Sequence, residues 1–175
     1  MPQPDFITAF GRLLRDGALR DAYAISPAAA LDHLNVQEAE RSALANLNLE
    51  DLEAQARVLL RKRFEIVQHL IPQTCSNLAD QAWPQFAGYS RSNWPSDPTA
   101  SAIDAQQFLA HLQQSYPELI STAEENRVRF ALGTKRVSLH FLPHFVICRL
   151  TRPCLQLFVR WTESRWCEYV FYLAL

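Results

Sequence analysis

Five side chains that can bind a metal lie within 28 residues of the C-terminal part of the chain: His140, His144, Cys148, Cys154 and Cys167. Zinc sites usually pair donors two to four residues apart on a turn, and His140 and His144 have that spacing around Pro143. The three cysteines fall on different expected strands, where each fits equally well as a small core residue. A structural role is therefore favoured over a stand-alone zinc or iron site, and we expect no resident metal or cofactor.

Motifs for other catalytic chemistry are missing from the sequence. The chain has four glycines, so a glycine-rich phosphate loop cannot form from one segment. Neither an HExxH metalloprotease motif nor a GxSxG nucleophile elbow occurs. Scattered residues can still assemble a catalytic site, but the sequence favours a protein that is not an enzyme.

Charge is distributed unevenly along the 175 residues, although the formal net charge is −1. Residues 1–125 hold nine Lys and Arg against sixteen Asp and Glu, a net charge of −7. Residues 126–175 hold eight Lys and Arg against two Glu, a net charge of +6. The hydrophobic content of 49% excludes a disordered chain. The absence of a long apolar run and of a signal-like N-terminus predicts a cytoplasmic protein without a membrane span.

The period of the apolar residues changes along the chain and predicts an α+β fold. Residues 1–118 show helical spacing and are expected to form a helical bundle domain. Residues 119–175 are expected to form a small antiparallel β-domain of four or five short strands. The expected strands are 135–142, 145–150, 155–161 and 166–173, with 127–132 as a fifth, after a last short helix at 117–125.

Arginines and aromatic residues concentrate in the expected β-domain. The candidate peptide-binding residues are Arg136, Phe145, Arg149, Arg160, Trp161 and Arg165. An open sheet edge can accept an added strand, and arginines attract an acidic peptide. Stacking and phosphate contacts make single-stranded nucleic acid the alternative ligand. The plainest interpretation is a solvated outer face whose aromatic residues pack on the helices.

A second basic cluster lies late in the longest expected helix, where Arg57 and Arg61 share one face and Lys62 and Arg63 follow. Pairing with Glu53 and Glu65 on a solvated face is the simpler interpretation. The sharper hypothesis is that Arg57, Arg61 and Arg63 bind a partner.

Four segments together resemble a known bacterial family. They are residues 6–16 (FITAFGRLLRD), 23–31 (YAISPAAAL), 52–63 (LEAQARVLLRKR) and 67–72 (VQHLIP). The chain resembles the partner subunits of multinuclear non-haem iron oxidative enzymes that modify ribosomally made peptides. The methanobactin (MbnC-like) and thiaglutamate (TglI-like) pathways contain the members that it resembles most.

The resemblance implies a non-catalytic subunit of a heterodimer. The iron would then lie in a TIM-barrel enzyme, and this chain would bind the leader of the precursor peptide by strand addition. A cysteine of the precursor would be oxidised with dioxygen in the enzyme. The alternative function is a nucleic-acid-binding regulator, although a pI near 6.5 and an acidic helical half disfavour nucleic acid as a partner.

Overall fold

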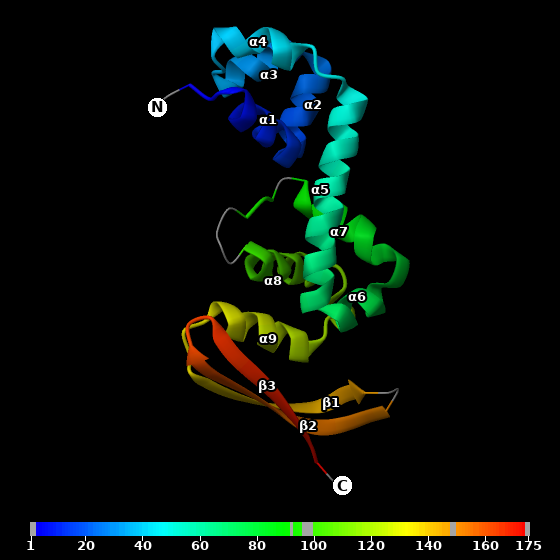
Figure 1. The fold of residues 1–175 in the computed structure, drawn as a ribbon. Helices are drawn as coiled ribbons and strands as arrows, with labels where there is room; N and C mark the ends of the chain where they lie inside the picture. The colour runs from blue at the N-terminus through cyan, green and yellow to red at the C-terminus, as the bar shows by residue number, and fades with distance from the viewer. Residues whose placement is uncertain (1–2, 92, 96–99, 148–149, 174–175) are drawn as a thin grey trace. The chain divides into compact units, whose positions relative to one another are not determined.

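The computed structural model describes residues 3–91, 93–95, 100–147 and 150–173. A mostly helical N-terminal part is followed by a small antiparallel sheet (Figure 1), which confirms the predicted fold class. The helical elements are α1 (Phe6–Arg15), α2 (Gly17–Ile25), α3 (Pro27–Leu34), α4 (Glu38–Ala45), α5 (Leu49–Leu70), α6 (Pro72–Leu78), η1 (Ala79–Gln81), α7 (Ala82–Ser90), α8 (Ala100–Leu112), η2 (Pro117–Leu119) and α9 (Thr122–Leu132). The strands are β1 (Val137–Ile147), β2 (Leu150–Thr162) and β3 (Arg165–Tyr172).

Helix boundaries in the N-terminal part follow local capping chemistry. Asp5 and Asp16 accept hydrogen bonds from backbone amides at the starts of α1 and α2. Ser26 caps α3 in the same way, with Pro27 at the first helical position. Asn35 ends α3 with a φ of 52°, a left-handed conformation that asparagine tolerates well.

Contacts between Cα atoms divide the chain into two units: residues 1–65 with 83–94, and residues 66–82 with 95–175. The predicted domain boundary at residue 118 stays a prediction. In the first unit, the core is made of buried residues from α1 to α5, among them Leu13, Tyr23 and Leu52. Arg20 is 2% exposed there and donates to the carbonyls of Leu13 and Leu14.

The prediction of a strand at 127–132 is wrong, because these residues belong to α9. Their alternation of Arg127, Val128, Arg129 and Phe130 is typical of a strand. Glu124 and Glu125 in the first turn favour a helix, and the amide of Gly133 caps the last turn by donating to the carbonyl of Arg129. Local helix signals therefore outweigh a six-residue alternation.

The sheet has the order β1-β2-β3 and is antiparallel throughout the described residues. The two runs predicted on either side of Pro143 form one strand, β1, which carries a register shift between Leu142 and Phe145. Pro143 has no amide hydrogen, so a bulge at an edge strand accommodates it. The described part of the chain therefore has three strands, fewer than the four or five predicted.

Helix α9 lies along one side of the sheet (Figure 1) and contacts β1 and β2. We call this side of the sheet the inner face and the opposite side the outer face. The buried strand residues Leu142, Cys154 and Phe158 all lie on the inner face. Within the described ranges, no helix has both the length and the apolar character that crossing a bilayer requires.

Candidate functional site

Aromatic stacking and a polar network fix the inner face against α9. The rings of Phe130 and Phe158 stack with centroids 4.9 Å apart, and Trp166 meets both rings edge-on. Gln156, which is fully buried, donates to the carbonyl of Ala123 at 2.8 Å and accepts from Asn126 at 3.2 Å. Each buried amide thus has a partner, as burial requires.

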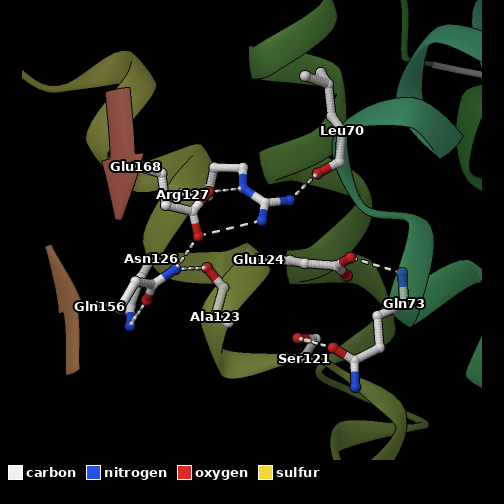
Figure 2. A network of polar contacts seen from close by, with 9 residues as sticks. All are labelled: Leu70, Gln73, Ser121, Ala123, Glu124, Asn126, Arg127, Gln156 and Glu168. Carbon is white, nitrogen blue, oxygen red and sulfur yellow. Dashed lines mark hydrogen bonds and ion pairs between the residues drawn. The ribbon is translucent and has the colours of Figure 1, made fainter. Parts of the chain in front are cut away.

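An ion pair continues this network across α9, as Figure 2 shows. The guanidinium of Arg127 binds the carboxylate of Glu168 at 2.5 Å and 3.2 Å and donates to the carbonyl of Leu70 at 3.5 Å. Glu168 also accepts from Gln156 at 2.8 Å. These contacts join β2, β3, α9 and the end of α5 within the second unit.

Arg160 is held by the backbone on the inner face. Its guanidinium donates to the carbonyls of Phe130, Ala131 and Glu163 and lies 5.0 Å from the centre of the Phe130 ring. Carbonyls at the end of a helix carry partial negative charge, so a cation there is stabilising. Arg160, one of the predicted peptide-binding residues, therefore binds carbonyls in the last turn of α9.

A pocket of about 560 Å³ opens beside Arg160, at the end of the sheet where β1 starts. We call it the end pocket. Arg136 and Trp161 line it together with the C-terminal turn of α9, and Trp161 is 60% exposed. Arg165, also exposed, begins β3 nearby in the chain and pairs with Thr162. Three of the predicted residues, Arg136, Arg160 and Trp161, are thus brought together.

The other predicted peptide-binding residues are placed differently. Phe145 is half-buried, packs with the core cluster around Leu142 and Cys154, and lies 6.3 Å from the ring of Tyr172. It does not line the end pocket. Arg149 lies outside the described residues. A role in binding for any of these residues stays a prediction.

The outer face is apolar across all three strands. Side chains alternate between the faces of a strand, so the register places nine residues there. They are Val137, Leu139, Phe141, Leu155, Leu157, Val159, Cys167, Tyr169 and Phe171. Leu139 is 60% exposed, Phe141 58% and Phe171 51%. Arg160 faces α9, whereas these apolar residues face away from it.

In the described part of the chain, the edge strands β1 and β3 each carry backbone groups that no neighbouring strand pairs with. The amide of Arg160 donates to the carbonyl of Arg136, just before β1, and the amide of Leu173 donates to the carbonyl of Pro153 on β2. In an antiparallel ladder such pairing alternates along a strand. The alternation directs the backbone groups of four β3 residues away from the sheet: Trp166, Glu168, Val170 and Tyr172. We call this row the β3 edge.

The predicted metal donors are separated by the sheet. Cys154 is fully buried on the inner face, whereas Cys167 is exposed on the outer face. His140 instead contacts the hydroxyl of Ser138 at 2.7 Å and meets the ring of Phe158 edge-on. Cys148 lies outside the described residues. Across the described ranges, no group of three or more His, Cys, Asp or Glu is arranged to hold a metal ion.

The basic cluster of α5 is partly used for packing in the first unit. The guanidinium of Arg61 lies 5.0 Å from the centre of the Trp83 ring, and that of Arg63 lies 4.6 Å from the centre of the Trp94 ring. Arg57 is exposed. Glu53 pairs with the buried Arg20 at 3.1 Å. The sequence predicts that Glu53 pairs with the basic cluster of α5, whereas the structure pairs it with Arg20.

Comparison with known proteins adds one partial similarity. Residues 45–114 match the family model described as "SCO6045-like, C-terminal domain", whose description names no activity, ligand or partner. The match covers less than half of the chain and lies within the helical part. No curated protein and no solved structure matches the chain.

Sequence reasoning missed the outer face as a candidate site. The alternation of Val137, Leu139 and Phe141 predicts a strand with one apolar face, but nothing in β1 says which side of the sheet is covered. The polar residues that mark the covered side are Gln156 on β2 and Glu168 on β3. A polar side chain within an apolar strand needs a partner, and α9 supplies Asn126 and Arg127.

Proposed function

We propose that this chain is a non-catalytic partner subunit that binds the leader of a ribosomally made precursor peptide. In this proposal the leader adds as a strand to the β3 edge and presents a cysteine of the precursor to a separate iron-dependent TIM-barrel enzyme. The observation that carries the proposal is an open edge strand beside an apolar face and a basic sheet end. Family resemblance in the helical segments supplies the class of enzyme and pathway, of methanobactin or thiaglutamate type.

The β3 edge suits strand addition better than the β1 edge. Residues Trp166 to Tyr172 pair with β2 without interruption and include no proline. β1 is broken by the register shift beside Pro143. An added strand gains affinity from main-chain hydrogen bonds and specificity from alternate side chains.

The chemistry of the β3 edge also describes the expected peptide. Every second side chain of an added strand would lie beside Cys167, Tyr169 or Phe171 on the outer face, so an apolar residue is favoured there. Exposed Arg136 and Arg165 at the end of the sheet favour a carboxylate in the flanking residues. A leader with alternating apolar residues and an acidic flank fits both features.

Backbone substitution tests strand addition directly. Val170→Pro removes an amide that points away from β2, so the β2–β3 ladder keeps its hydrogen bonds while the added strand loses one. We expect at least about a tenfold weaker affinity for the leader, measured by calorimetry with a synthetic peptide. Leu139→Pro is the matched control, because it removes an outward-pointing amide from the β1 edge instead. This variant should bind the leader with wild-type affinity. Far-ultraviolet circular dichroism verifies that both variants fold.

Two charge variants test the basic end of the sheet. Arg136→Glu and Arg165→Glu should each weaken leader binding, with an effect that shrinks at high salt. Arg160 is unsuitable for this test, because its guanidinium binds carbonyls of α9 and its replacement would disturb the fold. Unchanged leader affinity in Val170→Pro would remove the β3 edge from the site. Absence of leader binding by the wild type would overturn the proposed function.

Nucleic acid is the alternative ligand and gives a different result. Binding to single-stranded DNA would show a steep loss of affinity with salt, because phosphate neutralisation releases counterions. Val170→Pro would leave such binding unchanged, since nucleic acid does not use the strand backbone.

A further inference from the structure

We propose that the end pocket binds a carboxylate group, which Arg136 holds by hydrogen bonds and Arg160 attracts through its charge. An acidic side chain of a peptide and a free organic acid both carry this group. The inference needs neither the strand addition nor the enzyme of the proposed function. It rests on the residues that line the end pocket.

Two guanidinium groups that line the end pocket come from neighbouring strands. The register of β1 and β2 places Arg136 opposite Arg160, and the amide of Arg160 donates to the carbonyl of Arg136 at 2.8 Å. Side chains directly opposite each other have Cβ atoms about 5 Å apart, and like charges at such positions are destabilising. An anion bound beside both guanidinium groups would offset this repulsion.

The two arginines differ in the donors that a ligand can reach. Arg160 donates through Nη1 and Nη2 to three carbonyls, and its Nε is buried without a hydrogen-bond partner. Its guanidinium is therefore fixed, and it acts on a ligand through its charge. Arg136 is exposed, and within the described residues its side chain has no hydrogen bond or ion pair. Its N–H donors are thus available, in the planar fork that matches a carboxylate.

The remaining lining suits a carboxylate that is attached to an apolar group. Thr134 and Thr162 add hydroxyl groups, and the hydroxyl oxygen of Thr162 accepts from a backbone amide, which leaves its hydrogen to donate. Apolar surface comes from Ala131, Leu132 and Trp161. A volume of about 560 Å³ lies within the range of small-ligand sites, which combine apolar walls with a few polar groups.

The charge of the end pocket favours a ligand with a single negative charge. Arg136 and Arg160 bring two positive charges, and Glu163 lines the same pocket with one negative charge. Within the described part of the chain, Glu163 forms no ion pair with either arginine. The carbonyls in the last turn of α9 add partial negative charge. A carboxylate matches this balance, whereas a doubly charged phosphate would be repelled by Glu163 and these carbonyls.

Two-dimensional NMR of the isotope-labelled chain tests the site, because it detects weak binding and assigns it to residues. One probe is the dipeptide acetyl-Phe-Glu-amide, whose single carboxylate is a side chain, and the other is hydrocinnamate, a free acid. We expect a Kd on the order of millimolar, with shifts of the amides of Thr134 and Thr162. The neutral analogues acetyl-Phe-Gln-amide and hydrocinnamamide should bind at least about tenfold more weakly.

A charge variant with a matched control links the binding to Arg136. Arg136→Gln removes the guanidinium at an exposed position, so the fold should be retained while the Kd rises at least about tenfold. Arg152→Gln is the control, because Arg152 is an exposed arginine on the inner face that does not line the end pocket. This variant should bind both probes as the wild type does.

The order of the two affinities identifies the source of the carboxylate. Tighter binding of the dipeptide assigns it to a peptide side chain, and tighter binding of hydrocinnamate assigns it to a free acid. Four results would overturn the proposal: no shift of the pocket amides with either acid, neutral analogues that bind equally well, unchanged binding by Arg136→Gln, or tighter binding of phenyl phosphate than of both acids. Val170→Pro tests strand addition outside the end pocket, so the two proposals can fail separately.

Discussion

Individual polar side chains in this protein are buried where they bind backbone carbonyls or another buried side chain. Arg20 binds two carbonyls at the end of α1, and Gln156 binds the carbonyl of Ala123. The half-buried Arg160 binds two carbonyls in the last turn of α9 and the carbonyl of Glu163 after β2. A buried donor without such an acceptor would cost about 1–3 kcal/mol. These residues therefore maintain the fold, and the exposed Arg136, Arg165 and Trp161 are the better candidates for binding.

Cys75 gives the protein a predictable response to alkaline pH. Burial, followed by the nearby carboxylate of Glu124, raises the pKa of its thiol from the ordinary 9.0 to about 12. Above pH 9 the unfolded chain releases this proton while the folded chain retains it, so the free energy of unfolding falls as the pH rises to 12. The slope is at most about 1.4 kcal/mol per pH unit from this group.

Urea unfolding at several pH values checks the prediction. Cys75→Ala should flatten the fall between pH 9 and 12, whereas Cys167→Ala, at an exposed thiol, should leave it as in the wild type. Parallel curves for the Cys75→Ala variant and the wild type would contradict it.

At the scale of elements, α9 organises the second unit. Its Glu124 accepts hydrogen bonds from the amides of Gln73 and Thr74 at 2.6 Å and 2.8 Å, at the start of α6. Figure 2 shows Glu124 and Arg127 on the same helix, with Arg127 paired to Glu168 of β3. The first amides of a helix lack partners within it, so an outside carboxylate satisfies them. One helix thus holds both the start of α6 and the inner face of the sheet.

Removing that carboxylate tests the role of α9. Glu124→Ala leaves the partly buried amide of Gln73 and the buried amide of Thr74 without acceptors, and we expect the free energy of unfolding to fall by about 2–4 kcal/mol. Glu125→Ala is the matched control, because Glu125 makes an exposed ion pair with Arg129, worth about 0.5 kcal/mol. Thermal or urea unfolding distinguishes the two. Equal losses in both variants would contradict the special role of Glu124.

Elements with their own boundary signals were predictable from the sequence. Ser26 and Asn48 mark helix starts, and each accepts a hydrogen bond from a backbone amide in the first turn of its helix. The side of the sheet that is covered was not predictable, because it depends on α9 packing against β2 far along the chain. The two-residue alternation of side chains defines the two faces of a strand, but it does not show which face packs against a helix.

For the molecule as a whole, the acidic residues 1–125 and the basic residues 126–175 form different kinds of surface. The acidic half consists largely of helices with their own buried core, whereas the basic half carries the sheet and its apolar outer face. The exposed apolar face and the open edges make the isolated chain prone to association. A bound partner that covers the face would remove this tendency.

Charging the outer face should therefore make the isolated chain easier to keep dispersed. The double variant Leu139→Lys and Tyr169→Lys replaces two exposed side chains at the centre of the face, so the core loses nothing and the midpoint of thermal unfolding should stay within a few degrees. Light scattering should show aggregation beginning at a concentration several times higher than for the wild type, and binding of the dye ANS should decrease. Ile7→Lys with Ile25→Lys adds the same charge on exposed positions of α1 and α2, at 78% and 87% exposure. An equal improvement in that control would attribute the effect to net charge and reject the outer face as its cause.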